Sequence, residues 1–195
     1  MSLQITEKAL ALILEAEGLD QPGKWPGGGS GITLGIGYDI GFVTPEQLET
    51  DWSPFLSSDE IDRLKTAIGL TGGSAQQRAS QFRDITVTRE QAVEVFKNRT
   101  LPLHSKRTED AFPGVDQLPP DAQGALVSLV FNRGPSMAGD GRSEMRAVRD
   151  AVAQGDLREI AKQIRAMKRI WVGQGLDGLL KRRDAEADLV ESAIT

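Results

Sequence analysis

The segment from Thr33 to Asp39, TLGIGYD, constrains the fold more than any other part of the chain because its residues alternate in character. One parity is apolar and comprises Ile32, Leu34, Ile36, Tyr38 and Ile40. The other parity consists of glycines together with Thr33 and Asp39. Such alternation predicts a β-strand whose apolar side faces a core. The opposite side should be a flat, accessible glycine floor that presents Thr33 and Asp39.

Thr33 and Asp39 can act together only if the chain bends between them. In a straight strand they would lie roughly 20 Å apart. Gly35 and Gly37 lie between them and permit a tight turn or bulge. We therefore predict a hairpin corner that brings Thr33 close to Asp39. The alternative is a glycine-rich edge hairpin in which Asp39 serves only as a cap.

Glu17 is predicted to end the first helix with its side chain directed inward. Thr6 can cap that helix, and Gly18 suits a left-handed C-cap. The inward stripe comprises Leu10, Ile13, Leu14 and Glu17. Burying a carboxylate without a partner costs several kcal/mol, so such a group either takes up a proton or finds a partner. A raised proton affinity would favour a general-acid role. The alternative is an ordinary glutamate at a helix end, as we expect for the solvent-facing Glu15.

Two carboxylates and a hydroxyl are the groups that hydrolysis of a glycosidic bond requires. One acid protonates the leaving oxygen, a second carboxylate activates water, and a polar group holds that water. Glu17, Asp39 and Thr33 supply this set if the hairpin forms as predicted.

The same residues resemble the phage-type lysozymes, particularly their pesticin-like branch. The helix ending in Glu17-Gly18, the loop containing GGGSG and the motif TLGIGYDIG carry this resemblance. ALVSLVFNRG, residues 125–134, is similar to the central helix of these enzymes, and GLLKRRDAEADL, residues 178–189, to their C-terminal helix. The likeness is strong in the first forty residues and weaker between Thr50 and Thr88.

The resemblance implies an α+β, lysozyme-like fold with a small lobe that contains the glycine-rich β-hairpin and a larger all-helical lobe. We expect one catalytic domain over residues 1–195, with lobes at roughly 1–90 and 91–195. The first helix should pack on the C-terminal lobe.

The resemblance also implies the roles of the site residues. Glu17 would be the general acid, Asp39 the carboxylate that activates water, and Thr33 the hydroxyl that positions it. The activity would be that of an N-acetylmuramidase cleaving the β-1,4 bond between N-acetylmuramic acid and N-acetylglucosamine, with inversion. The simplest phage lysozymes carry their second carboxylate earlier, but residues 21–32 contain no acid here. Asp20 therefore remains an alternative to Asp39.

The C-terminal helix offers a partner for Glu17. Its predicted inward stripe comprises Leu176, Leu180, Arg183, Ala187, Val190 and Ile194. Arg183 interrupts this stripe, whereas Arg182 and Glu186 are expected off it. We predict that Arg183 pairs with Glu17 or spans the floor of the cleft, with Arg182 as the alternative partner. Arg183 could instead extend its charge to water along an apolar stem.

Four further residues have open roles. Asn132 follows an apolar run and precedes Gly134, so it either ends a helix or lines the sugar groove. Trp25 and Trp171 either stack on saccharide rings or anchor the packing. Tyr38 is a candidate supporting residue beside Asp39.

Composition excludes other chemistry. The chain has no cysteine and one histidine, His104, so a histidine-based triad and a His/Cys metal cluster are both excluded. We expect no cofactor. Its 195 residues include 23 basic and 28 acidic residues, a net charge of −5, which does not favour nucleic-acid binding. The alternatives to a hydrolase are a lytic transglycosylase and a non-catalytic wall-binding module.

No segment approaches the roughly twenty apolar residues of a membrane-spanning helix, and the start lacks the basic region of a signal peptide. We therefore expect a protein made in the cytoplasm that acts on bacterial peptidoglycan in the periplasm after delivery or host lysis. We expect a monomer, and an immunity or delivery partner remains open.

Local signals predict helices joined by short turns. Thr44 before Pro45, Ser57 with Glu60, and Thr88 with Gln91 are helix starts. Residues 69–74 should be a flexible loop, and 125–131 a buried central helix. Further helices are expected at residues 143–154 and after Asp156.

Overall fold

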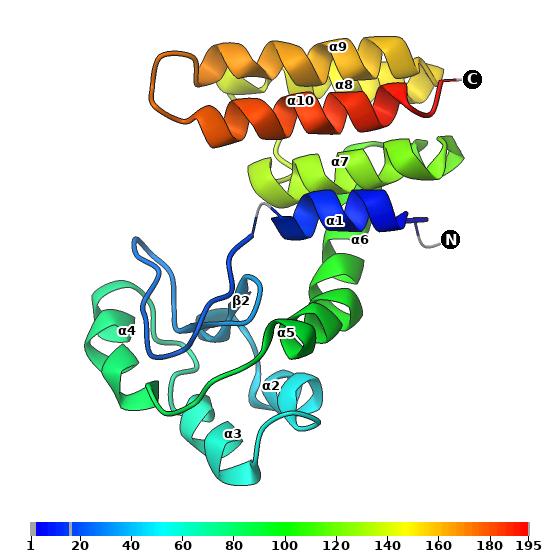
Figure 1. Cartoon of the computed structure of the whole chain (residues 1–195). Helices are drawn as coiled ribbons and strands as arrows, with labels where there is room; N and C mark the ends of the chain where they lie inside the picture. Colours follow the sequence, from blue (N-terminus) through cyan, green and yellow to red (C-terminus); the bar gives the residue numbers. More distant parts are fainter. Residues whose placement is uncertain (1–2, 16, 195) are drawn as a thin grey trace. The chain divides into compact units, whose positions relative to one another are not determined.

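The computed structural model describes residues 3–15 and 17–194, which form two compact units (Figure 1). The hairpin unit comprises Glu17–Pro102, and the helical unit comprises Met1–Ala16 and Leu103–Thr195. The fold is α+β, with a small antiparallel hairpin and otherwise helices, as the sequence predicts. That the whole chain is one catalytic domain, with lobes divided near residue 90, stays a prediction.

The hairpin unit contains the only sheet of the described residues. Its strands and α-helices are β1 (Thr33–Leu34), β2 (Tyr38–Asp39), α2 (Pro45–Trp52), α3 (Ser58–Lys65), α4 (Gly72–Ala79) and α5 (Arg89–Val95). Short 3-10 turns follow at Ile40–Phe42 and Ser80–Phe82, and a π-helical turn spans Phe96–Thr100. The predicted caps are confirmed, since Thr44, Ser57 and Thr88 each form a capping box at the start of α2, α3 and α5.

The hairpin forms at the predicted place. Thr33 pairs with Asp39 and Leu34 with Tyr38 in antiparallel register. Gly35 and Gly37 have φ angles of 67° and 63°, a conformation that a side chain with a Cβ rarely adopts. The predicted bend is therefore confirmed.

The apolar parity of the motif is buried, as predicted, but the opposite face is not an open floor. Ile32, Leu34, Ile36, Tyr38 and Ile40 are each at most 4% exposed. On the other face Thr33 and Gly35 are also buried. A Cβ added to Gly35 would lie 2.9 Å from the Trp52 ring and 3.2 Å from Ala92. The expectation of an accessible floor is wrong because α2 and α5 cover Gly35.

The predicted loop at residues 69–74 is partly helical instead. α4 begins at Gly72, whose backbone N–H donates to the Ser30 carbonyl at 2.9 Å. Ala75 is fully buried. This anchor and this burial give the segment the tertiary support that its glycine-rich sequence does not reveal.

The helical unit holds most of the α-helices. These are α1 (Glu7–Glu15), α6 (Leu101–Ala111, which begins at the unit boundary), α7 (Pro120–Arg133), α8 (Ser143–Gln154), α9 (Leu157–Ala166) and α10 (Asp177–Glu191). Short 3-10 turns lie at Val115–Gln117, Asp140–Arg142 and Met167–Ile170. α10 packs against α7 and α9, and α8 packs against α9 (Figure 1).

α7 is the buried helix at the centre of this unit, as predicted. All nine residues from Ala122 to Val130 are buried. α1 packs closely on it, since a Cβ added to Gly124 would lie 2.2 Å from the Cβ of Ala9. Thr6 caps α1 as predicted by accepting the N–H of Ala9 at 3.2 Å.

Two expectations for α1 are wrong, although Glu15 is exposed as predicted. The described helix ends at Glu15, and Glu17 lies in a bend beyond it rather than on the last helical turn. Gly18 does not have the positive φ of a left-handed C-cap. Ala16, which lies between Glu15 and Glu17, is outside the described residues.

The inward face of α10 also differs from the predicted stripe. Arg182 and Glu186, expected off the stripe, are 7% and 0% exposed, whereas Leu176 is 42% exposed. Arg183 is fully buried, as predicted. The reason is that α10 packs against both α7 and α9, so its buried face is wider than one stripe.

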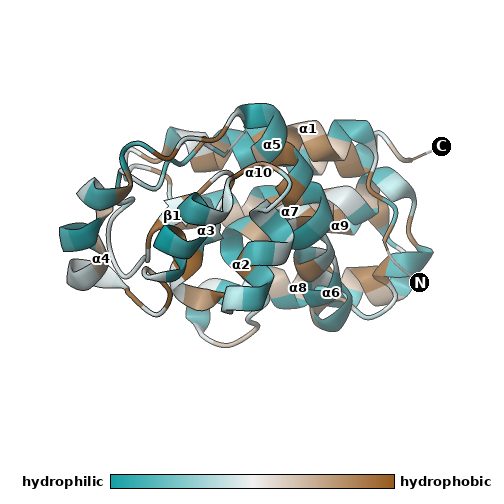
Figure 2. Cartoon of the chain, turned by 90° about the horizontal axis from the view of Figure 1, so that it is seen from below, coloured by the Kyte–Doolittle hydropathy of each residue, from teal (hydrophilic) through white to brown (hydrophobic). Residues whose placement is uncertain are grey.

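The hydropathy of the residues along the helices is consistent with how the helices pack. Hydrophilic residues line α3 and α4 (Figure 2). In the described part of the chain, no helix combines the length and apolar character needed to cross a membrane.

We predict that Gly35→Ala destabilises the fold by about 1–3 kcal/mol, because a Cβ at this positive φ would also collide with Trp52. Urea unfolding measures the change. Gly73→Ala is the matched control, since Gly73 is exposed in α4 with open space around it. It should stabilise by less than about 1 kcal/mol. Equal effects of the two substitutions would contradict the packing of the turn against α2.

Candidate active site

Thr33 and Asp39 face each other across the hairpin. As register partners in an antiparallel pair, their Cα atoms lie about 4.5–5.5 Å apart. Thr33 is 5% exposed, and Asp39 is half-buried. The structure therefore brings together the predicted hydroxyl and the predicted second carboxylate.

The carboxylate of Asp39 is held by backbone N–H groups of two glycines. Gly31 donates to Oδ2 at 2.9 Å and to Oδ1 at 3.1 Å, and Gly41 donates to Oδ1 at 2.9 Å. A Cβ on Gly31 would lie 2.3 Å from Oδ1, so this approach requires glycine. Because a carboxylate has about four acceptor positions, Asp39 retains capacity to bind water.

The hydroxyl of Thr33 is less constrained. Its Oγ1 lies 3.5 Å from the carbonyl oxygen of Gly31, the limit of a hydrogen bond. The same residue, Gly31, thus contacts both Thr33 and Asp39. If Thr33 and Asp39 together held a water, Thr33 would give up only its weak contact with the Gly31 carbonyl.

Glu17 belongs to the hairpin unit and is half-buried. Asp20 ties this segment to the hairpin, since its backbone exchanges hydrogen bonds of 2.7 and 2.9 Å with Gly35. At about 3.5 Å per residue, the chain places the Cα of Glu17 within roughly 10 Å of that of Asp20. Glu17 therefore lies in the segment that leads into the hairpin of Thr33 and Asp39, and the bridge at Asp20 limits how far its Cα can lie from that hairpin.

Asp20 itself is an unusual acid. Burial raises the pKa of its carboxyl, against the opposing effects of a hydrogen bond from the Gly37 backbone and the charge of Lys24. Asp20 thus remains the structural alternative to Asp39 as second carboxylate, with its backbone already used in the bridge to Gly35.

Tyr38 supports the hairpin from the core side. It is 4% exposed, its hydroxyl donates to Asp51 at 2.8 Å, and its ring packs edge-on against Trp52. Arg99 approaches the same oxygen of Asp51 at 3.5 Å. Burial, followed by the hydrogen bond to Asp51, raises the pKa of the Tyr38 hydroxyl. Sequence reasoning missed Asp51 and Arg99, because nothing in their local patterns points to Tyr38.

Trp25 is partly buried on the core of the hairpin unit. Its indole N–H donates to the Ser30 carbonyl at 2.9 Å. Trp25 therefore fixes the glycine-rich loop that leads into the hairpin, whether or not its ring also contacts a sugar.

The helical unit contains a buried charged cluster that the sequence only partly indicates. Glu186 is fully buried, and its Oε1 accepts hydrogen bonds from Ser128 at 2.6 Å and Arg183 at 2.8 Å. Arg182 lies 3.4 Å from the same oxygen. Burial raises the pKa of Glu186 and lowers that of Arg183.

The predicted pairing of Arg183 with Glu17 stays a prediction, because these residues belong to different units. Within the helical unit, Arg183 donates to Glu186, while its Nε and Nη1 atoms are buried and have no hydrogen-bond partner among the residues that the structure describes. Asn132 is half-buried in the last turn of α7, so its predicted place at a helix end is confirmed. Its role toward a sugar stays a prediction.

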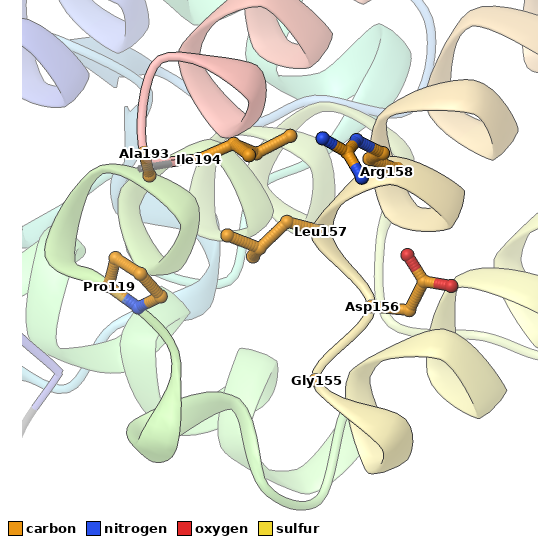
Figure 3. A pocket seen from close by; sticks show the side chains of 7 residues that line it. All are labelled: Pro119, Gly155, Asp156, Leu157, Arg158, Ala193 and Ile194. Atoms are coloured by element: carbon orange, nitrogen blue, oxygen red, sulfur yellow. The ribbon is translucent and has the colours of Figure 1, made fainter.

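A surface hollow lies on the helical unit, and none of its lining residues is a predicted site residue. It has a volume of about 350 Å³, and its lining comprises Pro119, Gly155, Asp156, Leu157, Arg158, Ala193 and Ile194 (Figure 3). Its one carboxylate, on Asp156, caps α9 by accepting the N–H of Glu159 at 3.0 Å. This lining does not supply the two carboxylates that the predicted hydrolysis requires.

Residues 57–186 match the family model described as phage lysozyme. The matched range begins after Asp39, so the roles of Glu17, Thr33 and Asp39 stay predictions. No curated protein matches the chain. Across residues 3–15 and 17–194, no group of three or more His, Cys, Asp or Glu side chains could hold a metal ion.

We predict that Glu186→Ala destabilises the protein by about 3–5 kcal/mol at neutral pH, because it leaves the buried guanidinium of Arg183 without its acceptor. Glu191→Ala is the control on the same helix. Glu191 pairs with Arg165 at the surface, so Glu191→Ala should unfold at nearly the same urea concentration as the wild type. Urea unfolding measures both, and a cost for Glu186→Ala no larger than for Glu191→Ala would refute the structural role of the cluster.

Proposed function

The chain belongs to the phage lysozyme family, and from this premise we propose that it is an N-acetylmuramidase of the inverting type. Family membership implies peptidoglycan as substrate and hydrolysis of the muramidase type. The bond that we propose is the β-1,4 linkage between N-acetylmuramic acid and N-acetylglucosamine. The pairing of Thr33 with Asp39 is the observation that supports this proposal most strongly.

Asp39 activates the attacking water. Its carboxylate is oriented by Gly31 and Gly41 before substrate arrives, so little reorganisation accompanies the reaction. Thr33, opposite Asp39, holds the same water through its hydroxyl. That the motif ends in this aspartate is also what supports the pesticin-like branch.

Glu17 is the general acid. It protonates the glycosidic oxygen as the bond to the leaving sugar breaks, while water attacks the opposite face of the sugar ring. In this arrangement the two carboxyl groups would lie about 6.5–9.5 Å apart, which leaves room for one water. A hydroxyl that positions water is most useful when water itself is the nucleophile, which favours inversion over a covalent intermediate.

A lytic transglycosylase is the second candidate, because such an enzyme needs only one acid at the position of Glu17. It would release anhydro-sugar ends in place of reducing ends. Mass spectrometry of the muropeptides from a digest separates the two reactions. We propose that the natural site of action is the bacterial cell wall, reached after delivery or host lysis.

We predict that Glu17→Gln lowers the rate of cleavage of purified sacculi by at least about a hundredfold, because the general acid is lost. Its free energy of unfolding should change little, because glutamine has nearly the same shape and volume as glutamate. Turbidity loss and released reducing ends measure the rate.

Glu15→Gln is the matched control. Glu15 ends α1 nearby and is exposed, so this variant should keep the wild-type rate. A Glu17→Gln variant with wild-type turnover would end the proposal. Anhydro-sugar ends from the wild-type enzyme would instead favour the transglycosylase.

A further inference from the structure

Phe42 is a large aromatic side chain that the fold leaves in water. The chain contains six phenylalanines, and Phe42 is 72% exposed while the other five are buried or half-buried. Single exposed apolar side chains are common on protein surfaces, so exposure alone does not make a site. What distinguishes Phe42 is the backbone that carries it.

This backbone is fixed to the carboxylate of Asp39. Asp39 caps the short 3-10 turn that ends at Phe42, because it accepts the N–H of Gly41 at 2.9 Å. Ile40, at the start of the turn, is fully buried, and its N–H donates to the Ile32 carbonyl at 2.8 Å. Since Phe42 follows Asp39 by three residues, their Cα atoms lie within roughly 10 Å of each other. The exposed ring therefore belongs to the same turn as the proposed catalytic carboxylate.

The turn is also packed closely against the segment that leads into α4. A Cβ added to Gly41 would lie 2.7 Å from the carbonyl oxygen of Leu70 and 3.1 Å from the Cγ2 atom of Thr71. Directly after the turn, Thr44 begins α2 with a capping box. A side chain carried by such a constrained backbone loses little conformational entropy when it binds a ligand.

Exposed glycine backbone lies near the same carboxylate. Gly31, which donates to both oxygens of Asp39, ends the glycine-rich loop of residues 27–31. Gly28 and Gly29 in this loop are exposed, and a Cβ added to either would meet no atom within 4 Å. Gly29 does not have a positive φ either, so neither packing nor backbone conformation requires glycine there. A surface without side chains lets a ligand approach the backbone closely.

We propose that Phe42 is a platform on which one sugar residue of the glycan strand stacks, close to the bond that is cleaved. The flat face of a pyranose ring in a β-1,4-linked glycan presents C–H groups, which pack favourably on the negative face of an aromatic ring. N-acetylglucosamine carries no charge, so an aromatic platform beside exposed backbone can bind it without an ion pair. This inference rests on the proposed function for the class of ligand, and it adds a sugar-binding residue to that site.

The test is an NMR titration of the full chain with chitotetraose, the β-1,4-linked tetramer of N-acetylglucosamine, in a Glu17→Gln background that suppresses cleavage. The backbone amide signals of Gly41 and Val43, which flank the platform, should shift and reach saturation. Phe42→Ala should weaken binding by about five- to thirtyfold, whereas Phe42→Trp should bind at least as tightly as the parent. Phe42→Leu keeps an apolar side chain but not a flat face, so it should restore only part of the lost affinity.

Leu103→Ala is the control, since Leu103 is an exposed apolar side chain on α6 in the helical unit. It should leave the binding of chitotetraose unchanged. With Glu17 intact, Phe42→Ala should raise the apparent KM for purified sacculi and leave kcat within about twofold of the wild type, because a stacking residue contributes binding rather than proton transfer. A purely structural role of Phe42 would not produce this split between KM and kcat.

The proposal is overturned if Phe42→Ala or Phe42→Leu binds chitotetraose as tightly as the parent, if Leu103→Ala weakens binding equally, or if the signals of Gly41 and Val43 do not shift. The proposed function fails on a different observation, which is wild-type turnover of sacculi by Glu17→Gln. The two failures are therefore distinguishable.

Discussion

Two backbone N–H groups donate hydrogen bonds to the carboxylate of Asp39, and the rest of the candidate site depends on this interaction. Gly31 and Gly41 hold the carboxylate from either side of the hairpin, and Thr33 lies directly across the strand pair. A side chain held this firmly is oriented before any substrate binds. The glycines of the motif therefore matter less as flexible points than as places where backbone can approach a charge.

The hairpin is supported from behind by the core of its unit. Tyr38, next to Asp39, is fixed by Asp51, and Gly35 packs against Trp52. The bridge between Asp20 and Gly35 connects the segment that carries Glu17 to the same turn. The proposed mechanism requires the two carboxylates to keep their relative positions, and these contacts limit the movement of the turn that connects their two segments.

The sequence predicted those features that depend on local chemistry. The alternating motif, the bend at Gly35 and Gly37, and the helix starts at Thr44, Ser57 and Thr88 all formed where their residue types require. Each is determined by a few neighbouring residues, so one sequence was enough to find it.

The features that could not be predicted from the sequence depend on contacts with residues elsewhere in the chain. Glu186 is buried because α7 and α9 both cover α10, which periodicity along one helix does not reveal. Likewise, α4 is anchored at Gly72 by the carbonyl of Ser30, a residue far away in sequence. Of the site, the residue types and the hairpin were predictable, while the bonds from Gly31 and Gly41 and the support from Asp51 were not.

The central claim is that Asp39 activates water while its oxygens are held by Gly31 and Gly41. Turnover of purified sacculi by Asp39→Asn tests it most directly, because the amide oxygen can still accept the two bonds that Oδ1 accepts, and only the bond from Gly31 to Oδ2 is lost. The account predicts a protein that unfolds cooperatively, as the wild type does, and cleaves at least about a hundredfold more slowly. Wild-type turnover by this variant would contradict it and would favour an enzyme that relies on Glu17 alone.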